Sequence, residues 1–123
     1  MSHGSEVFVM NNMSVRFEMV LLPAAQGFIE GQPEGVQEKV RQVLRTAAQD
    51  EDIKYFKELR EGIWEFRVQH LGDHFRLFAF WDESHHPPRV LVTHGWRKDV
   101  KRTPDAEIER AFVIKMEYEV KSA

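Results

Sequence analysis

Three closely spaced strand-like runs constrain the fold more than any other feature of the chain. The runs are Ile63–His70, His74–Asp82 and Arg89–Arg97. Alternation with a period of two indicates strands that are buried on one face. The connections at 71–73 and 83–88 are too short to carry a crossover between parallel strands. The three runs therefore predict an antiparallel meander.

The first half of the chain predicts one strand and one or two helices. Apolar residues alternate with charged ones at 15–22, which indicates a strand that Pro23 ends. Residues 24–30 suit a short helix, and residues 33–49 suit a longer one because apolar residues recur on one helical face. Residues 1–14 have no clear periodicity; we expect a loosely ordered segment or an extra edge strand near Val7–Val9. We expect a linker at Ile53–Glu61.

The last segment predicts a terminal helix near 104–120. Thr103, Pro104 and Asp105 are typical of a helix start, and an apolar stripe follows at Ile108, Ala111, Phe112 and Tyr118. A sheet needs helices to cover its apolar face. We therefore expect one α+β domain over residues 1–123. Its small, mainly antiparallel sheet has strands near 15–22, 63–70, 74–82 and 89–97, and one face of that sheet stays open.

Composition excludes several classes of protein and of site. A chain of 123 residues with 42% hydrophobic residues can build one core, and its 30% charged residues indicate a soluble surface. It has neither an apolar run near membrane length nor an opening signal segment, so we expect a cytoplasmic protein without membrane contact. Without cysteine, any chemistry must use His, Lys, Arg, carboxylates or hydroxyls. We expect no metal and no cofactor.

A cationic segment stands out against an acidic chain. The net charge is −3, but the segment from Arg89 to Arg102 holds five cations against Asp99 alone, a local balance of +4. Local charge matters most within a Debye length of about 8 Å. The segment is either a solvated strand end and loop or a surface for an anionic partner.

The strand alternation places several basic side chains opposite the core. Arg67 and Arg76 lie on the polar faces of their strands, while Val90, Val92, His94 and Trp96 share one face of the third. Neighbouring strands could gather five residues into one concave cationic surface: Arg67, Arg76, His94, Arg97 and Lys98. Two other interpretations stay open. The arginines could be structural, paired with Glu65 or Asp82, and His94 could be a hydrogen-bonded strand histidine.

Five ordered motifs resemble the RelE/ParE toxin superfamily, and in detail its HigB-like, phage-derived branch. They cover about residues 15–119. The motifs are Lys57-Glu58-Leu59, Gly62-Ile63-Trp64-Glu65-Phe66-Arg67, Phe75-Arg76, the strand ending His94-Gly95-Trp96-Arg97-Lys98, and Thr103-Pro104 with Glu107-Ile108 and Ala111 before Tyr118. Trp96 stands where the family usually has phenylalanine, and Asp99 stands where it usually has a cation.

The resemblance implies a RelE-like fold and a function. Members of this superfamily are toxins of type II toxin–antitoxin pairs, usually ribosome-dependent mRNA endonucleases. The partners implied are the ribosome with its mRNA and a cognate antitoxin, a helix-turn-helix protein encoded beside the toxin. By family position, Arg67 and Arg76 match the basic residues of the middle strands, and Arg97 and Lys98 match the cationic end of the following strand. Lys54 and Lys57 lie at the basic segment before them. We expect RNA contacts from Lys54, Lys57, Trp96, Lys101 and Arg102.

Metal-free RNA cleavage needs a base for the ribose 2′-OH, cations for the phosphate and an acid for the 5′-oxygen. Arg67, Arg76 and Arg97 suit the phosphate, and His94 is the candidate for proton transfer because the unperturbed pKa of histidine is about 6.5. Lys98 or Glu65 could serve in its place. Two rival interpretations remain: a ParE-like toxin that inhibits DNA gyrase without nuclease activity, and a phage-derived RelE-like domain that has lost activity.

Overall fold

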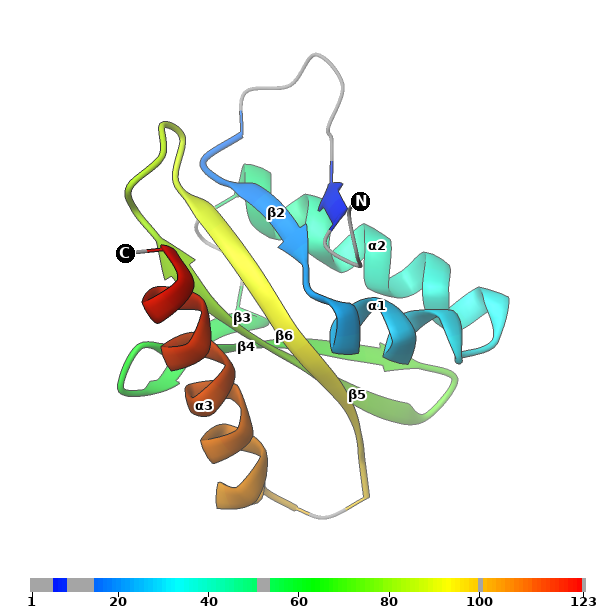
Figure 1. The fold of residues 1–123 in the computed structure, drawn as a ribbon. Coiled ribbons are helices and arrows are strands. Elements are labelled where there is room, and N and C mark those ends of the chain that lie inside the picture. The colour runs from blue at the N-terminus through cyan, green and yellow to red at the C-terminus, as the bar shows by residue number, and fades with distance from the viewer. Residues whose placement is uncertain (1–5, 9–14, 51–53, 100, 123) are drawn as a thin grey trace.

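The computed structural model describes residues 6–8, 15–50, 54–99 and 101–122 (Figure 1). Strands and helices follow the order that the sequence predicts, with two further strands. The elements are β1 (Glu6–Phe8), β2 (Glu18–Leu21), α1 (Pro23–Glu30), α2 (Glu34–Gln49), β3 (Phe56–Arg60), β4 (Ile63–His70), β5 (Asp73–Asp82), β6 (Arg89–Lys98) and α3 (Asp105–Ser122).

Within the described ranges, the strands form one six-stranded sheet in the order β1-β2-β6-β5-β4-β3. The meander β4-β5-β6 is antiparallel, as predicted, and β2 alone pairs in parallel, with β6. This confirms the predicted α+β class with a mainly antiparallel sheet. Strand β2 is shorter than the predicted 15–22, and β1 realises part of the suggested edge strand. The rest of the 1–14 segment lies outside the described residues.

The predicted linker at Ile53–Glu61 is wrong where it covers β3. Strand β3 pairs antiparallel with β4, from Phe56 opposite Phe66 to Arg60 opposite Ile63, with an irregular register between Glu58 and Arg60. Phe56 is the one residue of this strand that is buried. A short edge strand with a single buried residue and an interrupted ladder has no period-two pattern for the sequence to show.

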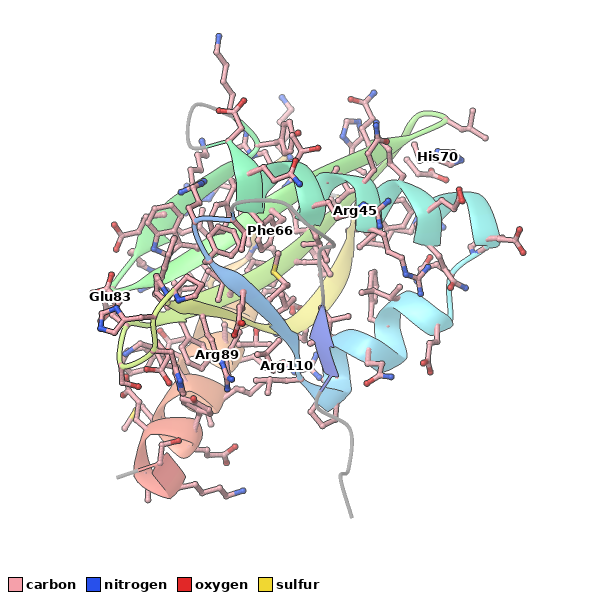
Figure 2. The ribbon with its side chains drawn as sticks, turned by 90° about the horizontal axis from the view of Figure 1, so that it is seen from above. Arg45, Phe66, His70, Glu83, Arg89 and Arg110 are labelled. Carbon is pink, nitrogen blue, oxygen red and sulfur yellow. The ribbon has the colours of Figure 1, made fainter. Side chains whose placement is uncertain are left out.

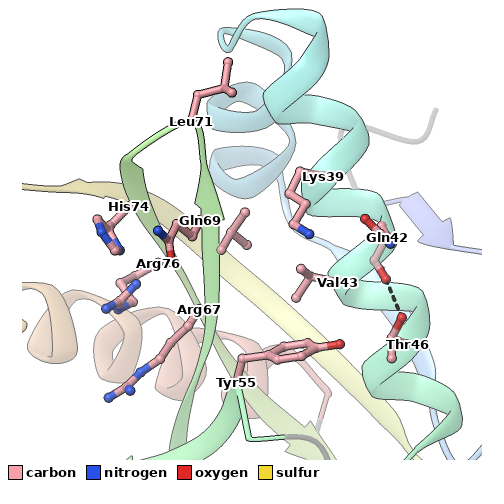
Figure 3. A pocket seen from close by; sticks show the side chains of 11 residues that line it. Lys39, Gln42, Val43, Thr46, Tyr55, Arg67, Gln69, Leu71, His74 and Arg76 are labelled. Atoms are coloured by element: carbon pink, nitrogen blue, oxygen red, sulfur yellow. Dashed lines mark hydrogen bonds between the residues drawn. The ribbon is translucent and has the colours of Figure 1, made fainter.

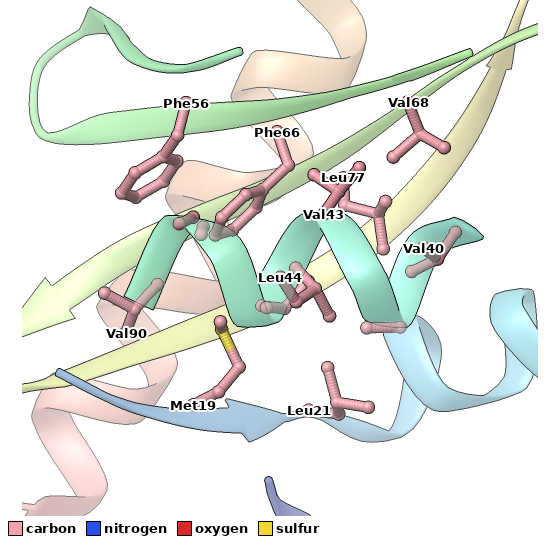
Figure 4. Close-up of a cluster of buried hydrophobic side chains, with 14 of the residues drawn as sticks. Met19, Leu21, Val40, Val43, Leu44, Phe56, Phe66, Val68, Leu77 and Val90 are labelled. Atoms are coloured by element: carbon pink, nitrogen blue, oxygen red, sulfur yellow. The ribbon is translucent and has the colours of Figure 1, made fainter. Parts of the chain in front are cut away.

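Helices α1 and α2 cover one face of the sheet, and both lie where the sequence predicts them. Pro23 opens α1 at a position where its missing N–H costs no hydrogen bond. The apolar stripe of α2, from Val36 to Ala48, is buried against the strands. Figure 4 shows this cluster between α2 and the sheet, with Met19, Leu21, Phe66, Leu77 and Val90 facing the helix.

Helix α3 covers the opposite face, so the expectation of one open sheet face is wrong. Figure 2 shows α2 and α3 on opposite sides of the strands. Ile108 and Ala111 of α3 are buried against a second apolar cluster on the sheet, formed by Val20, Ile63, Phe78, Phe80 and Leu91. Phe112 and Tyr118 pack at its margin, as the predicted stripe requires. The sheet is apolar on both faces because β5 is buried from Phe75 to Phe80 without alternation.

A β-bulge in β6 changes which side chains share a face. Phe78 pairs with His94, but the next residue, Ala79, pairs with Val92, so Thr93 is the extra residue. Val90 and Val92 belong to the cluster under α2, whereas Trp96 packs on the α3 side. The predicted single face for Val90, Val92, His94 and Trp96 is therefore wrong beyond Thr93.

Candidate nucleic-acid interface

Basic side chains gather on the α3 side of the sheet, beyond the residues that α3 covers. Arg67 on β4 lies directly opposite Arg76 on β5, and Arg76 lies opposite Trp96 on β6. In the next row His74 pairs with Lys98, and in the preceding row Lys57 pairs with Glu65. Directly paired residues project from the same face of a sheet. We call the four residues Lys57, Arg67, Arg76 and Lys98 the basic face.

Glu65 holds the two arginines at the centre of the basic face. Arg67 Nε donates to Glu65 Oε2 at 3.0 Å, and Arg76 Nε lies 3.5 Å from Glu65 Oε1. Arg76 Nη1 donates to its neighbour's carbonyl, Phe75 O, at 3.0 Å. Arg76 is 6% exposed and Glu65 is 1% exposed, whereas the Arg67 side chain is 43% exposed. The predicted pairing of structural arginines with Glu65 is therefore present in the structure.

Burial lowers the pKa of Arg76 from its ordinary value, Glu65 opposes that change, and the charge of Arg67 adds to it. An arginine nevertheless stays protonated because its ordinary pKa is so high. The basic face thus holds two adjacent guanidinium groups, an exposed one on Arg67 and a largely buried one on Arg76, with one buried counter-charge. Such planar forks match the oxygens of a phosphate group.

Arg97 does not join the basic face. It pairs across the sheet with Phe75, which lies under the helices on the α1 and α2 side, and its guanidinium donates to Asp73 Oδ1 at 2.8 Å. The bulge at Thr93 leaves Lys98 with the basic face and turns Arg97 away from it. The expected single surface of five residues is therefore wrong for Arg97.

His94 lies beneath α3 rather than on an open surface. It is 1% exposed and stacks on Phe78 at 4.8 Å between ring centroids. Thr93 Oγ1 lies 3.0 Å from its Nδ1, and Glu107 Oε1 of α3 lies 3.0 Å from its Nε2. This is the hydrogen-bonded strand histidine left open by the sequence. In this arrangement its ring contacts the protein on both nitrogens and is closed to solvent.

The buried position of His94 predicts a loss of stability in acid. Burial lowers the pKa of His94, against the opposing effect of the Glu107 contact, while Arg110 lowers it further. The unfolded chain, with an ordinary pKa of about 6.5, then binds the proton more readily than the folded chain. The free energy of unfolding should fall as pH drops below about 6.5. Denaturant titrations at several pH values from 7.5 to 5 measure this.

The control for that measurement is His94→Gln, which can hydrogen-bond but does not titrate in this range. Its stability should depend less on pH between 7.5 and 5 than that of the wild type, because the other groups are common to both proteins. Equal slopes would show that the pKa of His94 is the same in the folded and unfolded chains, and a wild type that gains stability in acid relative to the variant would show that the Glu107 pair outweighs burial.

A groove of about 630 Å³ borders the basic face along the outer half of β4 (Figure 3). The register of β3 ends at Phe66, so the following residues of β4 form an edge of the sheet. In Figure 3, Arg67 and Arg76 extend from the strands to the side away from α2. The groove also has polar residues that the sequence does not predict: Lys39, Gln42, Thr46, Tyr55, Gln69 and His74. Their spacing carries no signal, because α2 and β4 meet only in the folded chain.

The remaining predicted RNA contacts lie in different surroundings. Lys54, Lys101 and Arg102 are exposed, the last two in the segment that leads into α3. Trp96 is half-buried and packs at the margin of the cluster under α3. It therefore offers only part of its ring to a ligand.

No group of three or more His, Asp or Glu side chains in the described ranges is placed to hold a metal ion. No helix in that part of the chain has the length and apolar character needed to cross a membrane.

The protein is an α+β domain with a small, mostly antiparallel sheet and with helices toward both ends of the chain. This architecture is consistent with a RelE-like fold. The family model described as phage derived protein Gp49-like matches residues 27–115 of this chain. The chain belongs to this phage-derived Gp49-like family, which is a RelE/toxin-like family. No curated protein and no solved structure matched it.

Proposed function

We propose that this chain is the toxin of a type II toxin–antitoxin pair and cleaves mRNA on the ribosome without a metal ion. The observation that carries the proposal is the adjacent pair Arg67 and Arg76 at the groove along β4, with Arg67 exposed and Arg76 behind it. Membership of a RelE/toxin-like family supports it. The cytoplasm, where ribosomes work, would be its place of action, and an adjacently encoded helix-turn-helix antitoxin would be its partner.

In the proposed reaction the ribose 2′-oxygen attacks the adjacent phosphorus, and the bond from phosphorus to the 5′-oxygen breaks. A base takes the 2′-OH proton, an acid gives a proton to the 5′-oxygen, and a 2′,3′-cyclic phosphate remains. Arg67 and Arg76 would stabilise the charge that develops on the phosphate oxygens. Lys98, on the same face as Arg76, is a better placed proton-transfer candidate than the buried His94.

Exposed lysines and Arg102 would hold the RNA backbone around the reacting phosphate. A chain with net charge −3 and one modest basic face should bind free RNA weakly. Dependence on the ribosome follows, since the ribosome would supply the positioning that the protein's own charge does not.

Expression of the chain alone should arrest growth, and co-expression of the adjacently encoded small protein should relieve the arrest. Purified protein should cut mRNA within codons in a translating extract, and the same mRNA without ribosomes should stay intact. End analysis should find 2′,3′-cyclic phosphates at the cuts. Normal growth with soluble protein present would contradict the toxin proposal.

One observation favours a second function. Arg76 is buried and lies beside Glu65, as a structural arginine would, so the basic face could serve as a protein-binding surface of a ParE-like gyrase inhibitor. In that case growth would stop with mRNA intact and with gyrase-linked breaks in DNA. The same expression experiment distinguishes the two functions when the integrity of both the mRNA and the DNA is measured after growth stops.

A further inference from the structure

Glu65 is a buried carboxylate whose three neighbouring donors come from three separate segments of the chain. Arg67 Nε of β4 donates to Oε2, and Thr103 Oγ1, from the segment before α3, donates to Oε1 at 3.2 Å. Arg76 Nε of β5 lies 3.5 Å from Oε1. A carboxylate that is 1% exposed is costly to bury unless such partners compensate its charge. This arrangement therefore joins the basic face to the start of α3.

The two arginines would repel each other without this carboxylate. Arg67 and Arg76 are direct cross-strand partners, and like charges in that position destabilise a sheet. Glu65 lies on the same face, two residues before Arg67. Within the described residues, the bond from Arg67 to Glu65 uses Nε and leaves both Nη groups without a protein partner.

We propose that Glu65 is the positioning residue of the basic face, which holds the Nε sides of Arg67 and Arg76 so that the Nη groups of Arg67 and the Nη2 group of Arg76 are turned to a phosphate group, while Arg76 Nη1 stays bonded to Phe75 O. The expected effect of Glu65 on RNA cleavage rests on the proposed nuclease function. The placement of the two arginines by Glu65 does not depend on that function. Glu65 is not a catalytic base in this arrangement. Both of its oxygens lie against donors of the protein, and the side chain is closed to solvent.

Arg76 Nε contacts Glu65 as an ion pair and not as a hydrogen bond. It is buried and has no hydrogen-bond partner within the described residues, although Glu65 Oε1 lies 3.5 Å away. Thr103 donates to that same oxygen. The Oε1 atom is therefore shared between the lead into α3 and the arginine, and a small shift of Glu65 would change the contact with Arg76.

The test compares the wild type with Glu65→Gln and Glu65→Asp. Glutamine keeps the shape but loses the charge, and aspartate keeps the charge but shortens the reach. Asp73→Asn is the control, because Asp73 binds Arg97 on the other face. NMR of the arginine Nε–H groups should show exchange of the Arg67 proton with water at least about tenfold faster in Glu65→Gln, since a charged hydrogen bond is lost. Asp73→Asn should leave Arg67 unchanged.

A phosphate-binding measurement and a cleavage measurement separate loss of arginine positioning from the direct effect of removing a negative charge. Removal of a negative charge beside two cations would by itself strengthen the binding of inorganic phosphate, whereas loss of positioning should leave it equal or weaker. Ribosome-dependent cleavage should fall about 10- to 100-fold in Glu65→Gln with the pH–rate profile unchanged in shape. Glu65→Asp should be impaired as well. If Glu65→Gln does not fold and Glu65→Asp does, the same measurements on Glu65→Asp test the proposal.

Several results would overturn the proposal. Glu65→Asp as active as wild type would show that only the charge matters, and loss of one limb of the pH–rate profile in Glu65→Gln would show that Glu65 is a base. Unchanged Arg67 exchange in a folded Glu65→Gln would refute the geometry directly. A wild type that cuts no mRNA refutes the nuclease function, while the exchange and phosphate measurements still decide whether Glu65 positions the arginines.

Discussion

Arg76→Lys should lower ribosome-dependent mRNA cleavage by about 10²- to 10³-fold, the usual effect of removing one donor that stabilises charge in a transition state. Lysine keeps the positive charge. With a single nitrogen on a flexible stem, it cannot lie beside Glu65, donate to Phe75 O and still offer a further N–H group to phosphate, as the three nitrogens of Arg76 can. The loss should appear in the rate constant of the cleavage step, measured in single-turnover assays at saturating ribosome concentration.

Arg76→Ala should be as inactive but also less stable, because Glu65 would then keep only Arg67 and Thr103 as partners. Thermal melting separates the two effects, and Arg76→Lys is the variant expected to melt close to the wild type. Arg41→Ala, an exposed cation on α2, is the control for a general loss of positive charge.

Arg97→Ala gives a second comparison because it lies on the opposite face. Its effect on cleavage should be far smaller than that of Arg76→Lys. An equal loss in Arg97→Ala would mean that the RNA passes around the end of the sheet. Full activity of Arg76→Lys would instead assign Arg76 a structural role alone.

The sequence predicts the meander and both N-terminal helices because each has a clear period of its own. Strands β4 to β6 alternate or carry long apolar runs, and α2 repeats its apolar residues on one face. Strand β3 escapes prediction because its contribution to the core is Phe56 alone. Its pairing depends on β4, so the signal lies in a contact distant in the sequence and not in the segment.

The basic face is predictable in part for the same reason. Arg67 and Arg76 follow from alternation in two unbroken strands, and their register confirms that they are neighbours. His94 and Arg97 lie at or after the bulge at Thr93, where one extra residue reverses every side chain that follows. No local feature of the sequence marks that residue, because a bulge is set by the two partner strands together.

Gly95→Ala should destabilise the fold by about 3 kcal/mol, at the upper end for overpacking of a core, and lower the melting temperature by about 10 °C. A Cβ atom at Gly95 would lie 2.2 Å from Cδ2 and 2.6 Å from Cγ of Phe28. The ring of Phe28 also rests against Phe75, with centroids 6.3 Å apart. Relief therefore requires α1 to move away from β6 or the ring to leave its place.

Gly27→Ala is the matched control, because it adds the same methyl group one residue from Phe28. Nothing lies within 4 Å of a Cβ atom there, and the residue is inside α1. The variant should gain about 0.5–1 kcal/mol, the usual advantage of alanine over glycine in a helix. Thermal and denaturant melts of the two single variants should thus change in opposite directions.

A double-mutant cycle with Phe28→Ala identifies the cause. If contact with the ring is the reason for the cost, Gly95→Ala should cost little once Phe28 is already alanine, and the coupling energy should be about as large as the single effect. The glycine of the His94-Gly95-Trp96 motif then serves the packing of α1 on β6, which sets the strand that carries Trp96 and Lys98. An undiminished cost in the double variant would place the strain in the backbone of β6 instead.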